Sequence, residues 1–142
     1  MKKFRYPLAT SSWDNREYEA MQRVIESNKF TMGENVKIFE EQFAKYIGSK
    51  YCVMANSGSS ANLLMIAGLF FHSVFRLKPG DEVIVPAVSW STTYYPLFQY
   101  GLKIKFVDID LQTLNFNLEE LERAINKSPK LIFAVNVLGN PN

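Results

Sequence analysis

The sequence contains one cysteine and one histidine, and its 16 basic residues nearly balance its 14 acidic ones. The lone Cys52 excludes an internal disulfide, so we expect a reducing compartment and a buried, chemically inert thiol. His72 stands at the end of an expected helix, where we expect it to face solvent. Because no second histidine or cysteine accompanies it, we expect no soft-metal site and no hydrolase triad.

The sequence also lacks runs of like charge and long apolar segments. A net charge of +2 with scattered Lys and Arg argues against nucleic acid or an anionic membrane as a partner. The apolar segment 61–71 is shorter than the roughly 20 residues that a bilayer requires. No apolar stretch follows the basic N-terminus, so we expect no secretory signal and a cytoplasmic location.

What the sequence does contain is enough apolar residues for a core, at 47% of its 142 residues. The first part predicts two helices. Asp14 and Glu17 form a capping pair, and the second helix is expected over 34–47 and to end at Gly48. The apolar positions that share one face of the first helix are Tyr18, Met21, Val24 and Ile25. We expect residues 1–48 to form a helical arm.

From residue 51 onward, strand-like and helical segments alternate. The expected strands are 51–55, 82–86, 103–109 and 131–137. The expected helices are 59–72, 91–100 and one that Asn117 caps, with Leu118, Leu121 and Ile125 pointing inward. This alternation is typical of a parallel sheet with helices on both faces, so we expect an α/β fold over 49–142.

The sequence ends in a loop directly after the last expected strand. A parallel strand is normally followed by a crossover helix, so we expect these residues to belong to a longer protein and 49–142 to be an incomplete domain. The alternative is a small flavodoxin-sized domain.

Small polar residues follow the expected strands, and the carboxyl ends of parallel strands lie at one edge of the sheet. Ser57-Gly58-Ser59 comes between a strand and a helix, where free backbone N–H groups bind phosphate. The alternative is a simple helix cap and tight turn. The motif lacks the lysine of a P-loop and the spacing of a dinucleotide fingerprint, so we expect a compact phosphate monoester.

Trp90 follows the strand at 82–86, in a run of Ser and Thr. An indole at the edge of a sheet can stack on a planar ring, whereas the alternative is packing in the core. Asp108 and Asp110 follow the next strand. Two acidic residues at a strand end are typical caps and turn formers, and we prefer that to acid–base or metal chemistry.

Several motifs then occur in a characteristic order: residues 31–33, 39–40, 43–48, 56–63, 79–86 and 106–110. Together they resemble the N-terminal part of the DegT/DnrJ/EryC1/StrS family, sugar aminotransferases of the pyridoxal-phosphate fold type I. The resemblance implies that Gly58 and Ser59 hold the phosphate of pyridoxal 5'-phosphate or pyridoxamine 5'-phosphate. It implies that Trp90 stacks on the pyridine ring and that Asn136 approaches the cofactor. It also implies a homodimer, with the large cofactor-binding domain beginning at residue 49.

Residues 88–96 and 138–142 are most similar to the nucleotide-sugar 3-dehydratase branch of this family. That branch implies C3 dehydration of a nucleotide-linked 4-keto-6-deoxy sugar, in dideoxysugar and O-antigen biosynthesis. Thr31, Met32 and Gly33 are implied to lie near the sugar-nucleotide site or a dimer contact.

No catalytic residue is identified in this chain. In this family, aminotransferases use a lysine to bind the cofactor covalently, and dehydratases have a histidine in its place. The resemblance implies that this position lies beyond residue 142. There are three alternatives to a 3-dehydratase: a sugar aminotransferase, a catalytically inactive remnant and an unrelated phosphate-binding module.

Overall fold

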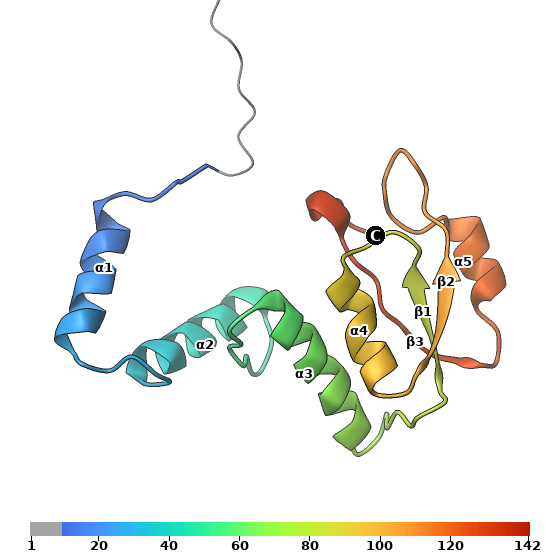
Figure 1. Cartoon of the computed structure of the whole chain (residues 1–142), viewed down its shortest axis with the longest axis horizontal. Coiled ribbons are helices and arrows are strands. Elements are labelled where there is room, and N and C mark those ends of the chain that lie inside the picture. The colour runs from blue at the N-terminus through green and yellow to red at the C-terminus, as the bar shows by residue number, and fades with distance from the viewer. Residues whose placement is uncertain (1–9) are drawn as a thin grey trace, which may run out of the picture. The chain divides into compact units, whose positions relative to one another are not determined.

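The computed structural model describes residues 10–142 and divides into two compact units, one ending at Met54 and the other beginning at Ala55 (Figure 1). The basic N-terminus, in which we expect no secretory signal, lies outside the described residues. No helix within 10–142 has the length and apolar character needed to cross a membrane. The division expected after residue 48 stays a prediction.

The N-terminal unit contains the two helices that the sequence predicts. Helix α1 spans Asn15–Glu26, and Asp14 and Glu17 form the expected capping box at its start. Helix α2 spans Glu34–Ile47 and ends at Gly48, whose φ of 77° is the left-handed conformation that glycine adopts readily. Ala44 is the one buried residue between positions 10 and 54, so most apolar side chains described in this unit are exposed.

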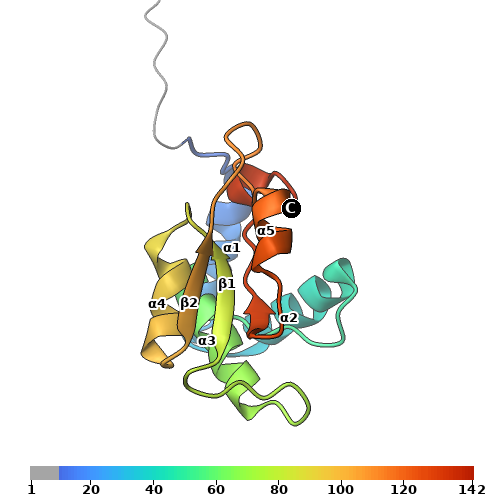
Figure 2. The same cartoon turned by 90° about the vertical axis from the view of Figure 1, so that its right-hand side faces the viewer.

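The second unit is an α/β structure, as expected. Strand β1 (Glu82–Pro86) lies between β2 (Lys103–Val107) and β3 (Pro129–Ile132), and it pairs with both in parallel. The helices are α3 (Gly58–Phe71), α4 (Ser91–Gln99) and α5 (Leu118–Ala124), with a 3₁₀ turn at Val137–Gly139. Figure 2 shows α4 on one side of the strands and α5 on the other.

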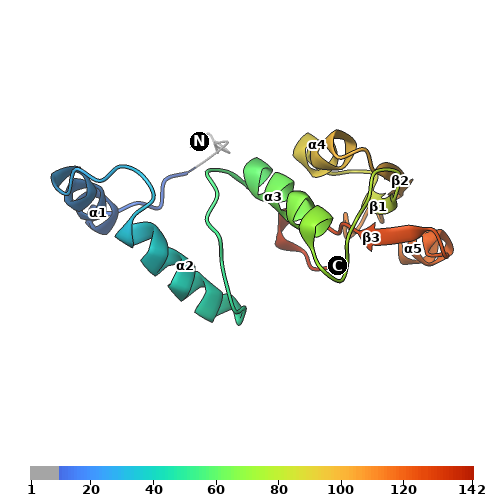
Figure 3. The ribbon, with the colours of Figure 1, turned by 90° about the horizontal axis from the view of Figure 1, so that it is seen from below.

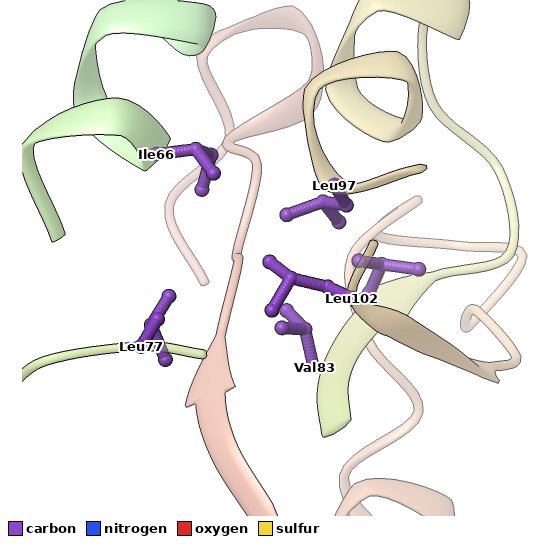
Figure 4. Close-up of a cluster of buried hydrophobic side chains, with 6 residues drawn as sticks. Ile66, Leu77, Val83, Leu97 and Leu102 are labelled. Atoms are coloured by element: carbon purple, nitrogen blue, oxygen red, sulfur yellow. The ribbon is translucent and has the colours of Figure 1, made fainter. Parts of the chain in front are cut away.

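Strand β1 is apolar at successive positions because both of its faces are buried. Val83 and Val85 pack on the face that α3 and α4 cover, together with Ile66 and Leu97 (Figure 4). Ile84 points to the opposite face, where it packs with Ala124 of α5, Val107 and Phe116. Helix α3 runs beside α4 (Figure 3). The first residues of both helices and the segment after β3 line one concavity, so both helices begin near the carboxyl ends of the strands.

The strand expected at 51–55 does not form, and that prediction is wrong. Tyr51 and Val53 are 75% and 74% exposed, and no strand of the described chain pairs with this segment. The Met54 N–H instead donates to Glu40 Oε1 at 2.8 Å. An apolar, β-prone segment becomes a strand only when another strand satisfies its backbone groups, and the local sequence does not reveal that partner.

Three further expectations need correction. The third expected strand ends at Val107 instead of residue 109, because Asp108 begins a loop in which its carboxylate accepts from the Ile109 N–H. The fourth expected strand lies at Pro129–Ile132 instead of 131–137. On α5, Leu118 and Ile125 are 73% and 53% exposed, since Ala124 and the half-buried Leu121 make its contacts with the sheet.

The fully buried Leu97 provides a test of the core shared by α3, α4 and β1. We expect Leu97→Ala to lower the free energy of unfolding by about 2–5 kcal/mol, because it removes buried apolar contacts and leaves a cavity. The neighbouring Phe98 is 77% exposed, so Phe98→Ala should change it by roughly 0.5 kcal/mol or less. Urea unfolding of both variants measures the difference, and equal losses would contradict the packing described here.

Candidate functional site

A concavity of about 710 Å³ lies where the carboxyl ends of the strands meet the beginnings of two helices. Three separate segments line it: the first turns of α3, the loop and first turn of α4, and residues 135–138 after β3. Gly58, Ser59, Trp90 and Asn136, each selected from the sequence, all border this cavity. The fold therefore brings these four residues together around one cavity.

The first turn of α3 presents free hydrogen-bond donors to the cavity. Ser57 caps the helix, because its Oγ accepts from the Ser60 N–H at 3.2 Å and its carbonyl accepts from the Ala61 N–H at 3.0 Å. Among the hydrogen bonds of the described chain, none engages the N–H groups of Gly58 or Ser59. The turn is thus a capped helix start that still has free N–H groups, so the cap does not exclude anion binding there.

The space over Gly58 is open. A Cβ built at this position would meet no atom within 4 Å, and its backbone φ is not in the left-handed region. Neither packing within this unit nor backbone conformation therefore requires glycine at position 58. The first turn of α3 therefore has open space beside its free N–H groups.

Trp90 borders the same cavity as the N-cap residue of α4. Its carbonyl accepts from the Thr93 N–H at 2.9 Å, which holds its backbone, while its side chain is 76% exposed. The indole is therefore not a core residue. It offers an uncovered aromatic face on a backbone that is held in place.

The walls of the cavity around Trp90 are held by hydroxyl groups. Ser89 Oγ and Thr93 Oγ1 lie 2.9 Å apart, and Thr93 is 3% exposed. Tyr94 Oη donates to the Pro86 carbonyl at 2.8 Å, and burial raises the pKa of this phenol. These bonds connect the first turn of α4 to its own preceding loop and to the end of β1.

Asn62 borders the cavity but was not predicted from the sequence as a site residue. Its Nδ2 donates to the Thr92 carbonyl at 3.2 Å, joining the second turn of α3 to the first turn of α4. Both residues line the cavity. The residue type alone carried no signal for this role, because an asparagine in an otherwise apolar helix has many possible partners.

The third wall is the segment after β3. Asn136 Oδ1 accepts from the backbone N–H and from Nδ2 of Asn142, both at 3.1 Å. Leu138 adopts a φ of 54° and is 92% exposed, and Gly139 follows with a φ of 79°. Two successive left-handed residues turn the chain back sharply, which keeps Asn136 and Leu138 beside the cavity.

Thr31, Met32 and Gly33 belong to the N-terminal unit. Thr31 and Gly33 line a separate concavity of about 840 Å³ between residues of α1 and α2, and Met32 is 73% exposed. All residues that line this concavity belong to the N-terminal unit.

The acidic residues at the end of β2 form turns, as expected. Asp110 accepts from the N–H groups of Thr113 and Gln112 at 2.9 and 2.8 Å, and these bonds hold the pKa of its carboxyl below the ordinary value. Within residues 10–142, no cluster of three or more acidic, histidine or cysteine side chains is placed to hold a metal ion.

Histidine does not contribute to the cavity either. His72 is exposed at the end of α3, where its Nδ1 accepts from the N–H groups of Val74 and Phe75 at 3.1 and 3.0 Å. Helix α3 has 14 residues, which places His72 roughly 20 Å from the first turn. Of the described residues that line the cavity, none has an ionisable side chain.

Comparison with known proteins gives consistent matches. Residues 11–142 match the model of the DegT/DnrJ/EryC1/StrS aminotransferase family. GDP-4-keto-6-deoxy-D-mannose 3-dehydratase of Escherichia coli O55:H7 is 66% identical over 137 residues, which are 96% of this chain and 35% of that relative. A solved structure of the E. coli GDP-4-keto-6-deoxy-D-mannose-3-dehydratase with bound hydrated PLP is 65% identical, with a TM-score of 0.94 over 97% of this chain and 36% of that one.

An aminotransferase is more distant. UDP-2-acetamido-2-deoxy-3-oxo-D-glucuronate aminotransferase of Pseudomonas aeruginosa is 32% identical over 84% of this chain and 32% of its own length. The chain thus spans about a third of the length of the curated relatives it matches.

Proposed function

We propose that this chain, which belongs to the DegT/DnrJ/EryC1/StrS aminotransferase family, forms the seat for pyridoxal or pyridoxamine phosphate in a nucleotide-sugar 3-dehydratase. The observation that carries the proposal is the position of a helix start with free N–H groups and an exposed indole around one cavity. Greater identity to a 3-dehydratase than to an aminotransferase favours dehydration over amino transfer. Membership of the family removes the alternative of an unrelated phosphate-binding module.

The phosphate is proposed to bind at the first turn of α3. The N–H groups of Gly58 and Ser59 and the positive end of the helix dipole favour a compact dianion, and the Ser59 hydroxyl adds one donor. The open space over Gly58 fits this group, since a phosphate oxygen must approach the backbone closely. The residues present therefore suit the phosphate of the cofactor.

Trp90 is proposed to cover one face of the cofactor ring. An aromatic face that is 76% exposed beside a polar cavity can stack on a pyridine ring and exclude water from that side. Asn136 completes the rim, with Oδ1 engaged by Asn142. When bound, the cofactor supplies an electron-accepting ring that stabilises negative charge on a substrate carbon. The groups that move protons are proposed to come from other parts of the whole enzyme.

For the whole protein we propose a nucleotide-linked 4-keto-6-deoxy sugar as substrate, as the name of the E. coli relative indicates for that enzyme. Thr31, Met32 and Gly33 are proposed to contribute to the sugar-nucleotide site or to a homodimer contact, since Thr31 and Gly33 border a concavity of their own unit and Met32 between them is exposed. A role in lipopolysaccharide biosynthesis is supported by a Salmonella typhimurium relative of that name. The single cysteine supports a cytoplasmic location.

Gly58→Ala tests the phosphate seat. We expect the dissociation constant for pyridoxamine phosphate, measured by equilibrium dialysis, to rise about tenfold or more, because the new methyl group occupies the space of the anion. Stability should be retained, since that methyl group meets no atom within 4 Å.

Gly68→Ala is the matched control, because Gly68 also lies in α3 with open space around it but does not border the cavity. We expect it to bind the cofactor normally. If Gly58→Ala bound the cofactor as well as the original chain, the phosphate would not sit at this turn.

Trp90→Ala tests the ring contact. We expect a loss of binding free energy for pyridoxamine phosphate of about 1–3 kcal/mol, the range for stacking of a planar base on an aromatic side chain. Binding of inorganic phosphate should be unchanged. Tyr95→Ala is the control, because Tyr95 is an exposed aromatic residue of α4 outside the cavity, and equal effects of the two substitutions would refute stacking by Trp90.

The product formed by the whole enzyme tests the reaction. With a nucleotide-linked 4-keto-6-deoxymannose and an amino-acid amine donor, we expect mass spectrometry to show loss of the C3 oxygen with the 4-keto group retained. Replacement of the keto oxygen by an amine would instead identify an aminotransferase. The absence of any turnover would favour a catalytically inactive protein.

A further inference from the structure

Helix α4 contains a proline at a position that leaves one of its carbonyls without a helical partner. In an α-helix, the N–H of each residue donates to the carbonyl four residues earlier. Pro96 lies inside α4 and has no N–H, so the carbonyl of Thr92 lacks this bond. Thr92 borders the cavity and is partly buried, and a carbonyl there requires another donor.

Asn62 of α3 supplies that donor. Its Nδ2 lies 3.2 Å from the Thr92 oxygen, and this is the only hydrogen bond that the described chain forms between α3 and α4. Further along, the two helices are held by apolar contacts through Ile66 and Leu97. The second turn of α3 and the first turn of α4, which both border the cavity, are therefore joined by the Asn62–Thr92 bond.

The bond connects the two parts of the proposed site. Asn62 follows Gly58 by one helical turn, and Thr92 follows Trp90 by two residues. The Ser89–Thr93 contact orders the start of α4 but lies within that segment, so it does not set the distance to α3.

We propose that Asn62 is a positioning residue that sets the spacing between the phosphate seat on α3 and the ring-covering Trp90 on α4. This inference rests on the proposed function. Asn62 itself contacts neither the phosphate nor the ring, because its Nδ2 is bonded to the Thr92 carbonyl. It satisfies a carbonyl that a proline has left free, and the resulting bond orients Trp90 toward a ligand whose phosphate is already held.

The test compares Asn62→Leu with Ser60→Ala in the complete chain. Leucine has the same branched shape as asparagine but no donor, whereas Ser60 lies two residues earlier in α3 and makes no bond to α4. We expect Asn62→Leu to raise the dissociation constant for pyridoxamine phosphate about threefold to tenfold, the effect of losing one hydrogen bond. The affinity for inorganic phosphate should stay within about twofold, and Ser60→Ala should change neither affinity.

A double-mutant cycle with Trp90→Ala isolates the positioning effect. If Asn62 acts through the indole, Asn62→Leu should have no effect on pyridoxamine phosphate binding once Trp90 is absent. The proposal would be overturned if Asn62→Leu lowered the affinities for pyridoxamine phosphate and inorganic phosphate equally. It would also be overturned if Asn62→Leu had its full effect in the Trp90→Ala background. Either result would show that Asn62 acts through the phosphate seat. Unchanged affinity in Asn62→Leu would overturn it too.

Pro96→Ala separates positioning from stability. The alanine N–H can donate to the Thr92 carbonyl within α4, so adding Pro96→Ala to Asn62→Leu should recover the urea midpoint and keep the variant folded. Because that bond does not reach α3, weak binding of pyridoxamine phosphate should persist. Recovered affinity in this double variant would overturn the proposal.

If the original chain binds inorganic phosphate but not pyridoxamine phosphate, the proposed function itself fails, which differs from each outcome above.

Discussion

The structure depends on the parallel pairing of β1 with a strand on each side. Because β2 and β3 both run in the direction of β1, the segments that follow all three strands emerge at one edge of the sheet. Burial of Val83 and Val85 on one face and Ile84 on the other makes β1 the centre of two apolar clusters. Helix α4 covers one face and starts at that same edge, so the polar residues near its start border a common cavity.

The chemistry of that cavity comes from the backbone as much as from side chains. The N–H groups of Gly58 and Ser59 are free because they begin a helix, and Trp90, directly before α4, is 76% exposed. None of the described residues bordering the cavity is ionisable, which suits a site that holds a group and leaves proton transfer to other parts of an enzyme. Similarity to proteins about three times as long is consistent with such a partial role.

Predictions from the sequence succeeded where a local rule applied. Capping of α1 by Asp14, the end of α2 at Gly48 and the turns formed by Asp108 and Asp110 all follow from interactions between residues close in the chain. They failed where a distant partner was needed. The segment 51–55 has the composition of a strand but pairs with none in the described chain, and α5 presents Ala124 to the sheet while Leu118 stays exposed.

The sequence by itself determined the local elements and the candidate ligand groups, because turn residues, caps and apolar spacing act within a few positions of the chain. It also contained Pro96, which leaves the Thr92 carbonyl without a helical donor whatever surrounds it. Only the tertiary structure decided that Asn62 satisfies that carbonyl across 30 positions, and that Gly58 and Trp90 border one cavity. Those relations require two helices to pack on the same face of the sheet, and such packing arises from contacts between distant residues that no local pattern specifies.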